Sequence, residues 1–391
     1  MKLCHLDFTK LYIMLQWNKF FERDVIFMGK NSQYYEQKYR KEKQRLEAMK
    51  LQLPKCAIDV LEYKEQSVQT STMISYCYDL RTFFKYYLTL ESARVDNIKD
   101  ITAKDLGAIE PKDLIAYQRY LEFNEIGEYH KNTKKSIARK VTTLRTLYKY
   151  HFENGNIDVN PMLKVPMPKL KKDKAITKMT PTEITLMLKA VSRTSGIKKG
   201  RAFTFKKKTR QRDMAIITLL LNTGIRVSEC VGLDLSDVDT RDCSVTVVRK
   251  GGAQDIVFFN KDVKKVLQAY LRERKNVKVV PGHEQAFFLS LQGRRISVDS
   301  IERTVRAFSR KTVPNKHITP HKLRSTFGTE LYKKTGDIRL VKECLGHDNI
   351  QTTIRYYAAF DDDYKRKAAK SINFTLNAKN KNGENESDKE V

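Results

Sequence analysis

The stretch TPHKLRSTFGTELYKKTGDIRLVKECLGHDNIQTTIRYY, residues Thr319–Tyr357, carries the most information about this chain. Fewer than forty residues hold two imidazoles (His321 and His347), a guanidinium (Arg324) and a phenol (Tyr356). A phenol can attack phosphorus, and cations can bind the non-bridging oxygens of a phosphodiester. The combination therefore indicates phosphodiester chemistry rather than a metal centre or acyl transfer.

The same stretch predicts helix boundaries that would bring these side chains together. Thr319 and Pro320 are typical of the cap and first turn of a helix. The i, i+3 spacing then places His321 and Arg324 on one helical face. Gly346 predicts a helix end or turn, with the second histidine directly behind it.

Two earlier segments add further cations. In the motif TGIRVSE, Gly224 allows a tight turn that directs Arg226 inward at a helix start. Further on, Ser244–Val248 and Asp255–Phe259 alternate in polarity and predict a β-hairpin, whose glycine-containing turn carries Lys250. Neither segment is specific by itself.

Taken in order, these motifs resemble the tyrosine recombinase, or phage integrase, family. The shared pattern is TGIRVSE, a lysine before glycine in a hairpin, HKLR, LGH, and a tyrosine nine residues after His347. The catalytic resemblance covers about residues 177–360. The segment 56–165, with YDLRTFFKYY and SIARKVTTLRTLYKY, resembles that family's core-DNA-binding domain.

The resemblance implies a role for each motif residue. The two arginines would bind the scissile phosphate, the lysine would protonate the leaving 5′ oxygen, the first histidine would assist proton transfer at the nucleophile, and the second would donate to the phosphate. The tyrosine would form a 3′-phosphotyrosyl link. In chain order the implied catalytic residues are Arg226, Lys250, His321, Arg324, His347 and Tyr356.

Some alternatives stay open at these positions. Tyr357 directly follows Tyr356, and only the spacing from His347 favours the first tyrosine as nucleophile. Each histidine could by itself be a core residue, or a zinc ligand, although cysteine or carboxylate partners at metal-like spacing are missing. No metal or cofactor is expected, because cationic side chains would supply the charge stabilisation.

The charge balance points to a polyanionic partner. The chain has 75 Lys and Arg against 46 Asp and Glu, a formal net charge of +29. Two basic segments are candidates for contact with double-stranded DNA: a predicted helix from Ser136 and a predicted mobile loop over residues 197–212. A solvated face and a disordered insertion are the respective alternatives. The candidate DNA-binding residues are Lys135, Arg139, Lys140, Arg145, Lys206, Lys207 and Lys208.

The expected fold is mainly α with a small antiparallel β-sheet, in a helical core-binding domain followed by a mixed α/β catalytic domain of tyrosine recombinase type. An N-terminal extension, whose segment 33–50 would be a solvated arm or a packing helix, precedes these domains. The expected boundaries are 1–55 for the extension, 56–165 for the helical domain, 166–176 for a basic linker, 177–376 for the catalytic domain and 377–391 for a disordered tail.

The predicted function is site-specific DNA recombination, as the integrase of a mobile element or as an Xer-like resolvase. A catalytically silent DNA-binding relative and a type IB topoisomerase are the competing hypotheses. Exchange between two duplexes implies a tetramer on paired core sites. No apolar run approaches the length that spans a bilayer, and six scattered cysteines without a C-x-x-C pair indicate reduced thiols. We therefore expect no membrane partner and a cytoplasmic, nucleoid-associated protein.

Overall fold

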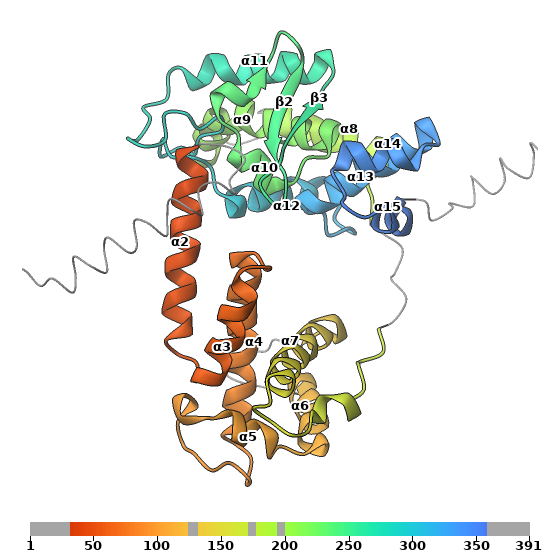
Figure 1. Cartoon of the computed structure of the whole chain (residues 1–391). Helices are drawn as coiled ribbons and strands as arrows, with labels where there is room; N and C mark the ends of the chain where they lie inside the picture. Colours follow the sequence, from red (N-terminus) through yellow and green to blue (C-terminus); the bar gives the residue numbers. More distant parts are fainter. Residues whose placement is uncertain (1–31, 124–131, 171–176, 194–199, 358–391) are drawn as a thin grey trace, which may run out of the picture. The chain divides into compact units, whose positions relative to one another are not determined.

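The computed structural model describes residues 32–123, 132–170, 177–193 and 200–357 (Figure 1). The predicted disordered tail, and most of the predicted extension, lie outside these residues. The chain divides into two compact units, of which the first holds residues 1–175 with 246–256 and the second holds 176–245 with 257–391. Within the described part, no helix is both long and apolar enough to cross a membrane.

The first unit is helical, as its sequence predicts. Helix α4 packs against α2, α3 and α7, and α6 packs against α7. The apolar face of α4 is buried at Leu80, Phe83, Phe84 and Tyr87, which lie in the core of the unit. The helices are α2 (Gln33–Lys50), α3 (Lys55–Glu65), α4 (Thr70–Tyr87), α5 (Ala103–Gly107), α6 (Pro111–Phe123) and α7 (Lys134–Glu153), with 3₁₀ turns η1 (Ile98–Asp100) and η2 (Pro161–Lys164).

Helix α2 is a packing helix rather than a solvated arm. Leu46 and Met49 are buried in the same core as the residues of α4. On its polar side, Lys43 and Lys50 of α2 form ion pairs with Glu65 of α3. Residues 33–50 therefore belong structurally with the helical unit, although the segment has few apolar residues.

Two helices begin with reciprocal capping boxes. Thr102 caps α5, because its side chain accepts from the Asp105 amide while the Asp105 carboxylate accepts from the Thr102 amide at 2.8 Å. Thr180 and Glu183 make the same reciprocal pair at the start of α8 (Pro181–Ser192). Each box satisfies amides that the first helical turn leaves without internal partners.

The second unit surrounds helix α9. This helix packs against α8, α11 and α13, and its apolar half from Ala215 to Leu220 is almost entirely buried. The remaining described elements of the chain are α10 (Val227–Gly232), η3 (Leu235–Asp237), β1 (Val238–Asp239), β2 (Ser244–Val248), β3 (Gln254–Phe258), α11 (Lys261–Arg274), α12 (Val298–Thr312), α13 (Pro320–Thr335), α14 (Ile338–Leu345) and α15 (Ile350–Tyr357). Of these, residues 246–256 of the β2–β3 hairpin are assigned to the first unit.

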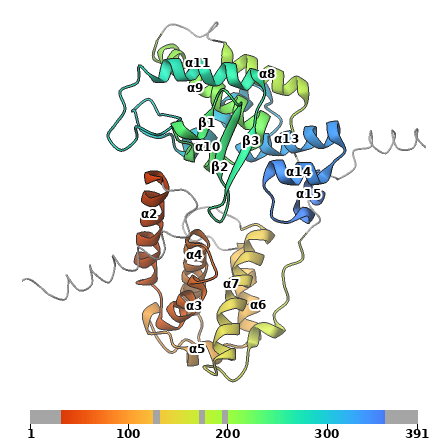
Figure 2. The ribbon, with the colours of Figure 1, turned by 45° about the horizontal axis from the view of Figure 1, so that its top comes forward.

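A small sheet accompanies these helices. Its strand order is β1-β2-β3, as Figure 2 shows. Strand β1 is antiparallel to β2, with Val238 opposite Val245. Strands β2 and β3 form the predicted hairpin, and the amide of Arg249 donates to the Ala253 carbonyl at 2.8 Å across its turn. The expected class, mainly α with a small antiparallel sheet, is confirmed.

The expectation of a mobile loop over residues 197–212 is wrong for its described part. Helix α9 runs from Arg201 to Thr223, so residues 201–212 form its first half. Lysine, arginine and glutamine are good helix formers, and Gly200 is the last strong helix breaker before the turn at Gly224. The dense positive charge therefore lies on a helix, which its apolar second half anchors in the core.

Lys206 differs from the two lysines that follow it. Its side chain is 8% exposed, and its ammonium donates to the Val191 carbonyl at 2.6 Å and lies 4.0 Å from the Phe308 ring centroid. Burial lowers the pKa of Lys206 to about 8. Lys207 and Lys208 are exposed. A DNA contact by Lys206 therefore has no support from its placement.

This burial predicts a pH-dependent gain in stability. As pH rises from 8 towards 10.5, folded Lys206 loses its proton while the unfolded chain keeps it, so the free energy of unfolding increases. We expect the wild type to gain stability relative to Lys206→Met over this interval in urea unfolding. Lys207→Met, which removes an exposed charge, should show no such gain. A difference independent of pH would contradict the burial of a titrating ammonium.

Candidate functional site

The turn after α9 fixes the backbone that precedes Arg226. Gly224 has φ 63°, in the left-handed region that glycine tolerates best. A Cβ atom at this position would lie 2.4 Å from a ring atom of Phe327 and 2.9 Å from Leu345. The TGIR turn therefore requires glycine both for its backbone conformation and for its close packing.

Glu229 holds Arg226 at the start of α10. The Glu229 side chain is buried, and its carboxylate accepts from the Arg226 amide at 2.7 Å and from the guanidinium at 2.8 Å. The second terminal nitrogen of Arg226 donates to the Gly346 carbonyl at 3.1 Å. The salt bridge to Glu229 and the hydrogen bond to the Gly346 carbonyl together orient the Arg226 guanidinium.

Arg324 joins three segments that are distant in sequence. It lies on α13, is 3% exposed, and donates to the Gly224 carbonyl at 2.6 Å and to the Leu345 carbonyl. Gly346, the left-handed residue that ends α14, is the next residue in the chain. Both guanidiniums therefore bind the same backbone turn, and this turn brings them together.

His321 lies in the first turn of α13, near both arginines. Its pKa is lowered from the ordinary value, mainly because the imidazole is partly withdrawn from water, and also because the positive charges of Arg324, Lys322 and Arg226 repel its protonated form. Its surface remains accessible to solvent. The geometry thus favours a neutral imidazole at neutral pH.

His347 directly follows the shared turn. Its Nδ1 lies 2.9 Å from the hydroxyl oxygen of Thr353, which is buried on α15. Helices α13, α14 and α15 pack against one another, so the histidine is held at their junction. Tyr356 lies near the end of α15.

Lys250 occupies the turn of the β2–β3 hairpin. Gly251 and Gly252 follow it with positive φ, and Arg249 before it pairs with Asp255. The lysine itself is exposed. It belongs to the first compact unit, whereas the other candidates belong to the second.

The second unit thus gathers four candidates: Arg226, His321, Arg324 and His347. Two oriented guanidiniums and two imidazoles form a positive environment suited to a phosphate group. Among the residues that the structure describes, no group of three His, Cys, Asp or Glu side chains could hold a metal ion. The sequence did not indicate the backbone carbonyls that orient both arginines.

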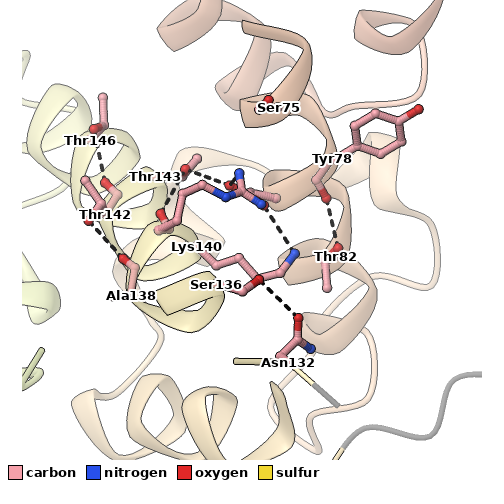
Figure 3. Close-up of polar contacts among 12 residues, drawn as sticks. Ser75, Tyr78, Thr82, Asn132, Ser136, Ala138, Lys140, Thr142, Thr143 and Thr146 are labelled. Atoms are coloured by element: carbon pink, nitrogen blue, oxygen red, sulfur yellow. Dashed lines mark hydrogen bonds and ion pairs between the residues drawn. The ribbon is translucent and has the colours of Figure 1, made fainter. Parts of the chain in front are cut away.

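A separate polar cluster joins α4 and α7 in the first unit (Figure 3). The buried carboxylate of Asp79 accepts from Arg139, from Lys140 at 3.2 Å and from the Thr143 hydroxyl at 3.0 Å. Lys140 is mostly buried, whereas the Arg139 side chain is 49% exposed. Sequence reasoning missed Asp79, although an acid among the apolar positions of α4 is a signal of such pairing.

The other two basic candidates on α7 differ from each other. Arg145 donates to the Val165 carbonyl at 2.9 Å, which ties α7 to the segment after η2. Lys135 is exposed near the start of the helix. The basic residues of α7 therefore differ in role: Lys135 faces the solvent, whereas Arg145 binds a backbone carbonyl of the same unit.

Comparisons with known proteins agree with this arrangement. A family model described as "Phage integrase family" matches residues 178–363. The chain is 32% identical over 338 residues to the tyrosine recombinase XerC of Caldanaerobacter subterraneus subsp. tengcongensis, which covers 84% of this chain and 89% of the relative. It is also 32% identical over 334 residues to the tyrosine recombinase XerS of Streptococcus equi subsp. zooepidemicus, covering 78% and 93%.

Two solved structures show similarity of fold. The Tn1549 transposon integrase in complex with circular intermediate DNA aligns with a TM-score of 0.58 and 19% identity, covering 81% of this chain and 99% of that one. The XerH recombinase bound to palindromic difH substrate aligns with a TM-score of 0.56 and 19% identity, covering 78% and 81%.

The electrostatic setting of His321 can be measured directly. In an NMR titration we expect its midpoint below the ordinary value of 6.5. Lys322→Gln removes one positive neighbour and should raise the midpoint, because the protonated imidazole is then less repelled. The matched change Lys333→Gln, near the other end of α13, should leave it in place. A midpoint at or above the ordinary value in the wild type would contradict the arrangement.

Proposed function

Because the chain belongs to the tyrosine recombinase family and is a site-specific DNA recombinase, we propose that the six motif residues form its catalytic set. The observation that supports this most directly is the shared turn at Leu345 and Gly346, which both guanidiniums bind beside His347. The proposed set is Arg226, Lys250, His321, Arg324, His347 and Tyr356.

Arg226 and Arg324 would bind the non-bridging oxygens of the scissile phosphate. Guanidinium is always charged and binds two oxygens in a fixed geometry. Because Glu229 and three backbone carbonyls already orient these side chains, little reorganisation is needed as charge develops on the phosphate.

The two histidines would have different tasks. His321 has a lowered pKa, so its neutral ring could accept the proton of the attacking phenol. His347, oriented by Thr353, would donate a hydrogen bond to the phosphate. The position of a proton on either ring depends on the hydrogen bonds that its nitrogens make.

The proposed reaction is a reversible transesterification. The phenol oxygen of Tyr356 forms a bond to phosphorus, and the bond from phosphorus to the 5′ oxygen breaks. Lys250 would give a proton to this leaving oxygen, which yields a 3′-phosphotyrosyl link and a free 5′ hydroxyl. A 5′ hydroxyl from another strand can then attack the link, restore the DNA backbone and release the tyrosine.

The proposed partner is double-stranded DNA with paired core sites, bound by four protomers. The XerH and Tn1549 integrase structures with DNA support a DNA partner. Residues 56–165 would bind the core site, and residues 177–376 would carry out catalysis. Lys135, Arg139, Lys207 and Lys208 keep side chains at the surface for such contacts. The proposal covers mobile-element integration and Xer-type resolution, because proteins of both kinds are similar to this chain.

A covalent intermediate tests the nucleophile. Incubation with a nicked duplex that carries a core site should produce a protein–DNA adduct at a 3′ phosphate, detected by denaturing electrophoresis. Tyr356→Phe should abolish the adduct and preserve binding, because only the attacking oxygen is lost. Tyr357→Phe is the matched control and should still form it. The reverse result would move the nucleophile by one residue.

A sulfur-substituted substrate tests the acid. Lys250→Ala should slow cleavage by about 10²–10⁴-fold, the usual contribution of general acid catalysis. Sulfur in place of the bridging 5′ oxygen leaves without a proton, so this substrate should restore most of the rate to Lys250→Ala. It should restore little to Arg226→Ala, whose defect is charge stabilisation. Failure to rescue either variant would assign the acid to another residue.

A further inference from the structure

We propose that Arg45, Tyr78 and Arg81 form a further contact site for the DNA backbone, on the face where α2 packs against α4. We call these three residues the Arg45–Tyr78–Arg81 cluster. The inference rests on the proposed function, because it names a part of the surface that would bind the duplex. It assigns a binding role to α2 in addition to its role in packing.

The cluster is built around one aromatic ring. The Arg45 guanidinium carbon lies 5.6 Å from the Tyr78 ring centroid, and that of Arg81 lies 5.5 Å from it. Arg45 also donates to the Tyr78 hydroxyl at 2.6 Å, and Arg81 donates to the Gln52 side-chain carbonyl at 2.8 Å. Each guanidinium thus has a defined position although the site is at the surface.

Neutral groups hold both arginines. A phenol oxygen and an amide oxygen orient a guanidinium without cancelling its charge. Within the described part of the chain, no carboxylate forms an ion pair with Arg45 or Arg81. Three other cations of α2 differ, because Arg40 pairs with Glu36, and Lys43 and Lys50 pair with Glu65. Two like charges that share one ring repel each other, and a bound anion would relieve this repulsion.

The cluster is not required to attach α2 to the unit. Leu46 and Met49 already bury the apolar side of α2, and the pairs with Glu65 hold its polar side to α3. A contact whose only purpose was packing would gain from a carboxylate partner. The observed combination of two oriented, uncompensated guanidiniums is instead typical of sites that bind phosphate.

The neighbouring surface of α4 would allow a DNA backbone to approach. Ser75 and Thr82 flank Tyr78 on this helix, and their hydroxyls donate back to the carbonyls of Ser71 and Tyr78. Figure 3 shows the Tyr78 ring projecting from α4 on the side away from α7. Arginine contacts to phosphate fix the register of a protein on a duplex without reading its sequence.

The test measures the salt dependence of binding with the full chain and a duplex of random sequence. Arg45→Gln and Arg81→Gln should each lower the magnitude of the slope of log K against log salt, by about 0.9 for each phosphate that the variant no longer neutralises. The double variant should show about twice the reduction. Tyr78→Phe, which keeps the ring but removes the acceptor for Arg45, should weaken binding less than either arginine variant.

The matched control is Lys112→Gln, which removes one exposed charge from α6, where Lys112 pairs with Glu110. Arginine variants that change the slope no more than this control would overturn the proposal. Thermal unfolding checks the fold. If a glutamine variant melts early, Arg45→Lys and Arg81→Lys, which keep the charge, should restore most of the slope, and failure to do so would also count against the site.

Two other outcomes separate this site from the general function. If the wild-type protein binds no duplex and forms no covalent adduct, the proposed function itself is contradicted. Variants that bind a single duplex normally but fail to assemble on paired sites would show that the cluster contacts another protomer. That result would overturn the phosphate site and leave the recombinase assignment intact.

Discussion

The hydrogen bonds from the buried guanidinium of Arg324 to the Gly224 and Leu345 carbonyls are the interaction on which the second unit most depends. A charge withdrawn from water is costly unless hydrogen bonds satisfy it, and here backbone carbonyls from two distant turns do so. These bonds tie the TGIR turn to the end of α14 through α13. The same contacts orient the side chain for a phosphate, so the stability of the unit and the chemistry of the site share one residue.

The structure uses its cations in three ways. Some are neutralised by acids, as Lys140 is by Asp79. Others are held by neutral oxygens and keep their charge, as Arg45 and Arg81 are. A third group is exposed, as Lys207 is. Net charge alone therefore says little about which cations face a polyanion. The acceptor that orients each cation is the more informative property.

Sequence patterns predicted those features that local chemistry determines. The β2–β3 hairpin, the start of α13 at Thr319 and Pro320, and the glycine that ends α14 all follow from residues close together in sequence. The family and its motif order were also recognisable. The first half of α9 was not predicted, because its lysines show no apolar periodicity. Its position depends on contacts in three dimensions, such as the packing of Lys206 against the Phe308 ring.

The site was harder to predict than the fold, for a physical reason. The groups that orient Arg226 and Arg324 are mostly backbone carbonyls, which every residue has and no sequence pattern marks. The ion pair between Asp79 and Arg139 could likewise not be predicted, because the two residues are 60 positions apart in the sequence. Spacing predicted which side chains take part, but the acceptors that hold them became visible only in three dimensions.

The close packing at Gly224 has a consequence for how the sequence can vary. Because Gly224 has no side chain, Phe327 and Leu345 occupy the space that a Cβ atom would need. The sizes of the residues at these three positions therefore depend on one another. A smaller residue at position 327 would free space without relieving the positive φ. Asparagine, which tolerates that conformation better than other residues, would then be the replacement with least strain. Among related chains, loss of this glycine should therefore accompany a reduction in size at the aromatic position.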